Sequence, residues 1–121
     1  MTGAKLPKVL VVEDEALLLF SIADDLRDQG FEVYEATDAD KAIAILEREP
    51  GIGVVFTDID MPGSMDGLKL SAYVRDRYPP IRIVITSGKS LPAAADLAAS
   101  LFLPKPYTTV GVIAALRAVI G

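Results

Sequence analysis

The sequence has no cysteine and no histidine among its 121 residues. Without cysteine, disulfide bonds, thiolate metal sites and cysteine nucleophiles are excluded. Without histidine, a Ser-His-Asp triad, an imidazole base and a histidine-ligated zinc site are excluded as well. The chain also cannot carry a phosphohistidine of its own. Any chemistry at a site of this chain therefore has to use other side chains.

Positive charge is scarce, and long apolar runs are missing. There are 12 Lys and Arg against 17 Asp and Glu, which gives a formal net charge of −5. The basic residues are scattered, so we expect no nucleic-acid partner. The longest apolar runs, such as Ala16–Phe20, have five residues, whereas a membrane helix needs about 20. No secretory signal follows the N-terminus. We expect a cytoplasmic protein that makes no contact with a membrane.

Expected strands and helices alternate along the whole chain. Runs rich in β-branched residues predict strands at KVLVVED (8–14), FEVYEA (31–36), IGVVFTD (52–58), IRIVITSG (81–88) and the minimal LFL (101–103). Apolar residues at helical spacing predict helices at 15–30, 38–51, 66–80, 90–100 and 107–121. We expect Gly30 to cap the first helix and Asp38 or Asp40 to begin the second.

This alternation predicts an α/β fold. Most of the strands are apolar on both faces, as in a parallel sheet covered by helices, so we expect a doubly wound, five-stranded parallel sheet. No linker, repeat or low-complexity segment interrupts the pattern. We therefore expect a single domain over residues 1–121, with its core at about 7–120.

Acids, hydroxyls and one lysine follow the strands at the points where they end. Right-handed crossovers bring these ends to one edge of the sheet, where ligands of such folds bind. The residues are Glu13 and Asp14 after the first strand, Asp58 after the third, Thr86, Ser87 and Gly88 after the fourth, and Lys105 after the fifth. We expect these side chains to form one site.

The chemistry of this set indicates a magnesium ion and a phosphate group. Three converging carboxylates repel one another unless a cation is present. With oxygen ligands and neither His nor Cys, Mg²⁺ is the expected metal. A lysine suits a phosphate, and a hydroxyl followed by glycine offers a donor with room for phosphate to approach. A carboxylate in such a site can act as a nucleophile toward phosphorus.

These motifs resemble those of the receiver domains of two-component response regulators, and the resemblance covers essentially the whole chain. VVEDE (11–15) resembles the paired acids of the family, DIDMPG (58–63) its phosphoacceptor motif, SG (87–88) its hydroxyl motif and PKPY (104–107) its lysine motif. The resemblance implies the flavodoxin-like fold with strand order 2-1-3-4-5. It also implies a phosphoacceptor function rather than an ordinary enzyme, because such a domain catalyses only its own phosphorylation and dephosphorylation.

The resemblance assigns a role to each residue of the site. Asp58 would accept the phosphoryl group, and Lys105 would hold it, with a cis peptide bond before Pro106. Asp14, Asp58 and the backbone carbonyl of Asp60 would ligate Mg²⁺, and Glu13 would act through water in the coordination shell of the metal.

The resemblance further implies a switch. Ser87 is the preferred switch hydroxyl, with Thr86 as the alternative, and Phe102 occupies the aromatic switch position. We also expect Asp60 to meet Lys89 across the opening of the site. Compared with common receivers, the chain is a few residues shorter between Ser87 and Lys105, and MPGSMDG (61–67) carries one extra residue.

The implied partner is a sensor histidine kinase or a histidine phosphotransfer protein. The face formed by the fourth helix, fifth strand and last helix would change on phosphorylation. The last helix carries a single charge, Arg117, between Thr108 and Ile120, so a homodimer or a downstream protein could cover it. The apolar Leu17 and Phe20 belong either to the core or to a docking surface.

Two other functions are compatible with the fold. The chain could be a flavodoxin-like binding module, but acids rather than a glycine-rich phosphate loop follow its first strand. It could also be a small Mg²⁺-dependent phosphatase, but a chain of 121 residues leaves no room for a substrate cap.

Overall fold

The computed structural model describes residues 6–60, 66–88 and 100–120. Five parallel strands form one sheet in the order β2-β1-β3-β4-β5. The strands are β1 (Lys8–Val12), β2 (Val33–Ala36), β3 (Ile52–Asp58), β4 (Arg82–Ser87) and β5 (Ser100–Pro104). This arrangement confirms the predicted doubly wound, flavodoxin-like sheet and its strand order.

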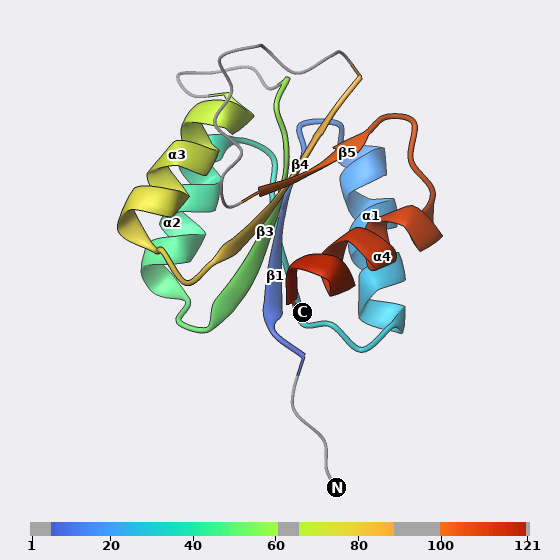
Figure 1. Ribbon diagram of the computed structural model, residues 1–121, viewed down its shortest axis with the longest axis horizontal. Coiled ribbons are helices and arrows are strands. Elements are labelled where there is room, and N and C mark those ends of the chain that lie inside the picture. The colour runs from blue at the N-terminus through green and yellow to red at the C-terminus, as the bar shows by residue number, and fades with distance from the viewer. Residues whose placement is uncertain (1–5, 61–65, 89–99, 121) are drawn as a thin grey trace, which may run out of the picture.

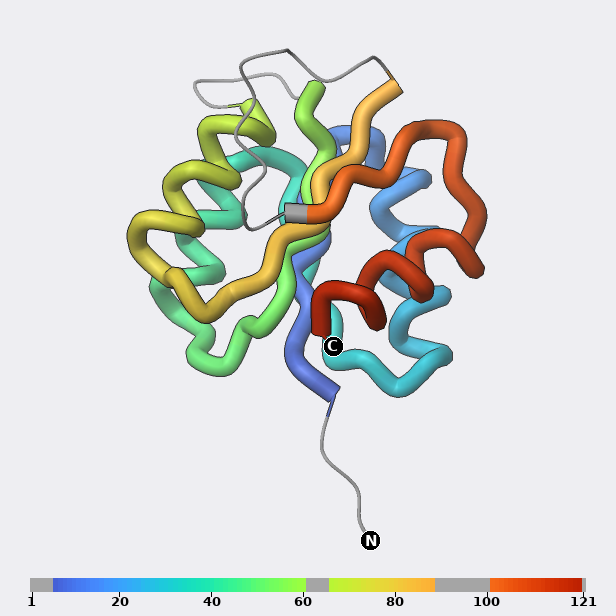
Figure 2. Tube along the Cα trace, viewed as in Figure 1, coloured from blue at the N-terminus to red at the C-terminus, as the bar shows by residue number. Residues whose placement is uncertain are grey.

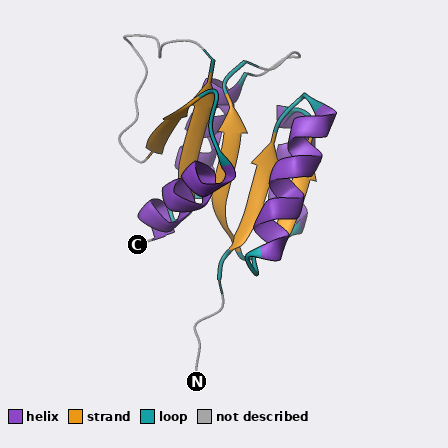
Figure 3. Cartoon of the chain, turned by 90° about the vertical axis from the view of Figure 1, so that its right-hand side faces the viewer, coloured by secondary structure: helices purple, strands orange, loops and turns teal. Residues whose placement is uncertain are grey.

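Helices cover both faces of the sheet (Figures 1 and 3). They are α1 (Ala16–Asp28), α2 (Ala39–Arg48), α3 (Gly67–Arg77) and α4 (Thr109–Ile120). The tube in Figure 2 shows α2 and α3 on one side of the strands and α1 and α4 on the other. The helix predicted at 90–100 falls almost wholly outside the described residues and has no label. The label α4 therefore belongs to the helix predicted at 107–121.

Capping residues set the helix boundaries as the sequence predicts. Asp38 begins α2, and its carboxylate accepts a hydrogen bond from the backbone N–H of Lys41 at 2.8 Å. At the end of α1, Gly30 adopts a φ of 95°, a conformation that suits glycine. This turn lets the N–H of Phe31 donate to the carbonyl of Leu26 at 3.1 Å, as in a Schellman motif.

Two apolar clusters fill the space between the sheet and its helices. On the side of α2 and α3, Val55, Ile83 and Ile85 of the strands pack in one cluster with Leu70 and Val74 of α3. The intervening strand residues turn to the side of α1 and α4.

In this second cluster, Phe56 and Val84 of the strands pack with Leu26 of α1 and Leu116 of α4. Strands β3 and β4 are therefore buried on both faces, which is why their sequences are continuously apolar.

Several apolar side chains of the helices stay exposed. Leu17 and Phe20 are 83% and 63% exposed on α1, so the alternative that places them in the core is wrong. Helix α4 buries Val112 and Leu116 but leaves Val110 76% exposed. None of the helices in the described ranges has the length and apolar character needed to cross a bilayer.

The strand register brings the carboxyl ends of β1, β3, β4 and β5 to the same edge of the sheet. Asp58 pairs with Thr86, and Ser87 pairs with Pro104. The backbone N–H of Lys105 then donates to the carbonyl of Ser87 at 2.9 Å. The predicted site residues consequently meet at this edge.

Candidate functional site

A cluster of three carboxylates lies at this edge of the sheet. Glu13 and Asp14 follow β1, Asp58 ends β3, and their carboxylate oxygens lie within 4.8 Å of one another. Glu13 and Asp58 are only 1% and 3% exposed, whereas Asp14 faces solvent. Their mutual repulsion has to be offset by positive charge.

Lys105 supplies part of that charge. Its ammonium group lies 2.9 Å from Oδ2 of Asp58 and 3.2 Å from Oε1 of Glu13. One ammonium group offsets one of the three carboxylates, so two negative charges remain when all three are ionised. An oxygen-only donor set with this charge fits a divalent, oxygen-preferring ion such as Mg²⁺.

The pKa values of Lys105 and Glu13 reflect this environment. Burial on its own lowers the pKa of Lys105, but the hydrogen bonds to Asp58 and Glu13, and the charges of both, raise it above its usual value. For Glu13 burial has the opposite effect and raises the pKa. The hydrogen bond from the backbone N–H of Glu15 lowers it, but by less. Lys105 is therefore a permanent cation at neutral pH, fixed against Asp58. Its peptide bond to Pro106 is cis, as expected.

Asp60 lies beside the cluster and contacts both Asp58 and Ser87. Its backbone N–H donates to Oδ1 of Asp58 at 3.1 Å, and its own carboxylate accepts a hydrogen bond from the Ser87 hydroxyl at 2.9 Å. The sequence did not predict this contact with Ser87. The expected partner, Lys89, lies outside the described residues, as does most of the MPGSMDG loop.

The two candidate switch hydroxyls point to opposite faces of the sheet. Ser87 shares its face with Ile85, two residues earlier, because side chains alternate along a strand. Phe102 pairs with Ile85 and packs against the cluster on the side of α2 and α3. Thr86 turns the other way, and within the described part of the chain its buried hydroxyl has no hydrogen-bond partner. Ser87 and Phe102 thus share a face, which favours Ser87 over Thr86.

Gly67 is a residue that sequence reasoning missed. It is the first residue of α3, and its N–H donates to the carbonyl of Ile59 at 3.0 Å. A Cβ at this position would overlap the backbone carbonyl oxygen of Asp58. The only signal in the sequence is a glycine directly after the capping residue Asp66, at the start of a helix.

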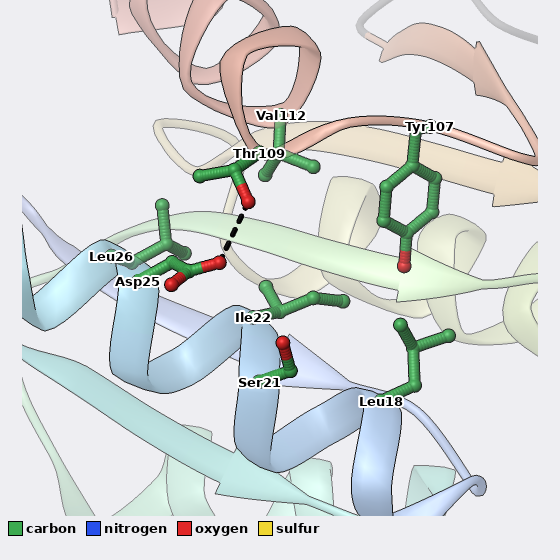
Figure 4. Close-up of a pocket in the computed structure, with 8 residues that line it drawn as sticks. All are labelled: Leu18, Ser21, Ile22, Asp25, Leu26, Tyr107, Thr109 and Val112. Carbon is green, nitrogen blue, oxygen red and sulfur yellow. Dashed lines mark hydrogen bonds between the residues drawn. The ribbon is translucent and has the colours of Figure 1, made fainter.

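Tyr107 connects the site to the layer of α1 and α4. It follows Lys105 by two residues, and its ring packs edge-to-face on Phe56 at 5.7 Å between centroids. The ring lines a cavity of about 100 Å³ between α1 and α4, next to Leu18 (Figure 4). Burial and the negative charge of Glu13 raise the pKa of Tyr107. Thr109 and Asp25 line the same cavity, where the Thr109 hydroxyl donates to Asp25 at 2.7 Å and joins the two helices.

A doubly wound parallel sheet with acids, a hydroxyl and a lysine at its carboxyl edge defines an α/β domain of the receiver class. The model of the response regulator receiver domain family matches residues 9–117. The chain belongs to this family and is a receiver domain of two-component signal transduction. A flavodoxin-like binding module and a phosphatase are therefore not favoured.

Known proteins agree with this assignment. The chain is 34% identical over 105 residues to the nitrogen assimilation regulatory protein NtrX of Azorhizobium caulinodans. The match covers 82% of this chain and 23% of that protein. The chain is also 35% identical over 115 residues to the sensory transduction protein RegX3 of Mycobacterium bovis. This match covers 93% of this chain and 50% of that protein. The chain thus spans half or less of the length of these relatives.

A solved structure shows the same architecture. A response regulator receiver protein from Sinorhizobium medicae superposes with a TM-score of 0.87 at 30% identity. The match covers 98% of this chain and 97% of that one.

Proposed function

We propose that Asp58 accepts a phosphoryl group from a phosphohistidine on a sensor histidine kinase or a histidine phosphotransfer protein. The observation that carries this proposal is the position of Asp58. It ends the central strand of the sheet, within 4.8 Å of the acids that follow β1, and 2.9 Å from Lys105. One carboxylate therefore faces both a candidate metal site and a fixed cation.

The transfer needs few protein groups. A carboxylate oxygen of Asp58 attacks phosphorus, the new O–P bond forms as the P–N bond breaks, and the electron pair leaves with the imidazole nitrogen, which takes up a proton. Lys105 donates to an oxygen of the phosphoryl group and offsets its charge. Mg²⁺, when bound, neutralises further charge on that group. Asp14, Asp58 and the backbone carbonyl of Asp60 would hold the metal, with Glu13 close by.

We infer that the domain catalyses only its own phosphorylation and dephosphorylation, and that residues of about 7–120 form its core. Ser87 would bind the phosphoryl group, and Phe102 would respond on the same face of the sheet. The surface of β5 and α4 would then bind a second copy or a downstream protein. The exposed Val110 supports this assignment, since it gives α4 an apolar side that is uncovered in the single chain.

A gel-shift experiment tests the acceptor. The protein is incubated with acetyl phosphate and Mg²⁺ and run on a Phos-tag gel, beside Asp58→Asn and a control, Asp24→Asn, which changes an exposed acid on α1. The parent and Asp24→Asn should shift, whereas Asp58→Asn should not, and EDTA should abolish the shift. Because Glu13 also contacts Lys105, mass spectrometry should place the phosphate on Asp58. Phosphate on Glu13, or an undiminished shift of Asp58→Asn, would contradict the proposal.

A further inference from the structure

The hydroxyl that we assign to the switch already has a strong acceptor. Ser87 Oγ donates to Oδ2 of Asp60 at 2.9 Å. Ser87 is buried and Asp60 is exposed, so the bond reaches from the end of β4 outward to the opening of the site. A hydrogen bond to a carboxylate is stronger than one between neutral groups. The Asp60–Ser87 hydrogen bond therefore favours one position of this hydroxyl.

The backbone fixes the two partners beside each other. The N–H of Ile59 donates to the carbonyl of Thr86 at 2.9 Å and extends the pairing of β3 and β4 by one residue. The N–H of Asp60 then donates to Oδ1 of Asp58 at 3.1 Å. Through its backbone Asp60 contacts the acceptor carboxylate, and through its side chain it contacts the hydroxyl.

We propose that Asp60 is a positioning residue, whose carboxylate holds the Ser87 hydroxyl in the phosphate-free protein and opposes the switch. This inference rests on the proposed phosphorylation of Asp58. A serine hydroxyl has a single proton, so it cannot donate to Asp60 and to a phosphoryl oxygen at the same time. The phosphoryl group on Asp58 and the carboxylate of Asp60 compete for it.

The position of the Ser87 hydroxyl affects Phe102, the proposed aromatic switch residue. Ser87 and Phe102 lie on the same face of the sheet, and Phe102 pairs with Ile85, two residues before Ser87. When the hydroxyl leaves Asp60, the packing next to Phe102 changes. A ligand shifts such an equilibrium only as far as it binds one state better than the other. Loss of the Asp60–Ser87 hydrogen bond should therefore make the switched state easier to reach.

Beryllofluoride, an analogue of the phosphoryl group, tests this inference at saturating Mg²⁺. The chain has four phenylalanines, so fluorine-labelled phenylalanine reports on Phe102 in a spectrum of few lines, and the core residue Phe31 shows that each variant is folded. The variants are Asp60→Ala, Asp60→Asn, Ser87→Ala and the double mutant that combines Asp60→Ala with Ser87→Ala. Glu15→Ala is the control for charge, because Glu15 is an exposed acid that lies near enough to raise the pKa of Tyr107.

Asp60→Ala should bind beryllofluoride about fivefold more tightly than the parent. Before beryllofluoride is added, its Phe102 signal should already lie closer to the bound position. Glu15→Ala should bind more tightly by a smaller factor, through charge alone. Asp60→Asn keeps an acceptor oxygen without the charge, so its affinity should lie between those of the parent and Asp60→Ala. In the Ser87→Ala background, Asp60→Ala should have no more effect than Glu15→Ala.

The possible failures are distinguishable. Equal effects of Asp60→Ala with and without Ser87 would show that only the charge of Asp60 acts, and would overturn the role of the hydrogen bond. Unchanged affinity of Asp60→Ala would overturn it as well. A parent protein that does not bind beryllofluoride at all would instead overturn the proposed function on which the inference rests.

Discussion

At the scale of single residues, Gly67 shows how closely the chain is packed at Asp58. The first turn of α3 lies directly against the end of β3, so that the space where a side chain at position 67 would begin is taken by the carbonyl of Asp58. This approach fixes the backbone that carries Asp58, the proposed acceptor. A glycine here therefore serves the site, although it brings no functional group of its own.

Gly67→Ala should lower the free energy of unfolding by about 1–3 kcal/mol, the usual cost of overpacking. An alanine in a helix normally gains about 0.5–1 kcal/mol over glycine, so the clash has to outweigh that gain. Urea denaturation measures the difference. Gly88→Ala is the matched control, because a Cβ at Gly88 meets no atom of the described residues within 4 Å. A Gly67→Ala protein as stable as the parent would show that α3 shifts without cost.

At the scale of elements, the ends of the helices are held by side chains that the sequence makes visible. Asp38 and Asp66 each accept a hydrogen bond from the N–H three residues later, at 2.8 and 2.9 Å. Such caps satisfy backbone donors that the helix cannot pair internally. They also fix where α2 and α3 begin, and α3 begins next to the site.

Removing the cap of α2 should destabilise the protein by a measurable amount. Asp38→Ala is expected to lower the free energy of unfolding by about 1 kcal/mol, whereas Asp38→Asn should stay close to the parent, because asparagine caps helices about as well as aspartate. Thermal or urea unfolding of the three proteins decides this. If Asp38→Asn lost as much stability as Asp38→Ala, the charge and not the cap would be responsible.

The arrangement of the elements could be predicted from the sequence, whereas two contacts at the site could not. The alternation of elements, their order and the meeting of Asp58, Glu13 and Lys105 at one edge follow from periodicity and from the geometry of parallel sheets. The contact between Asp60 and Ser87 depends on side-chain directions that only the register fixes. The clash at Gly67 likewise depends on the approach of a helix to a strand, which no local pattern reveals.

At the scale of the whole molecule, the site lies between two layers and touches both. Ser87 and Phe102 face the layer of α2 and α3, while Lys105 leads through Tyr107 to the layer of α1 and α4. Tyr107 borders a cavity of about 100 Å³ that Val112 also lines. The ring is therefore packed against Phe56 on one side and borders open space on another. We therefore expect a change at Lys105 to be felt at Val112 of α4, which lines the same cavity as Tyr107.

Binding of beryllofluoride with Mg²⁺ should shift NMR signals on both sides of the sheet. We expect changes at Phe102, through Ser87, and at the methyl groups of Val112, because Lys105 pulls on the segment that carries Tyr107 when it turns from Glu13 toward the phosphoryl oxygens. Methyl-labelled protein measures the change at Val112, and fluorine-labelled phenylalanine measures the change at Phe102. Val33 is the internal reference, because it lies on β2, at the opposite edge of the sheet from β5. Asp58→Asn is the control and should show none of these shifts. If the parent changed only in the segments next to Asp58, the two layers would not be coupled to the site, and the assignment of α4 to the output surface would be wrong.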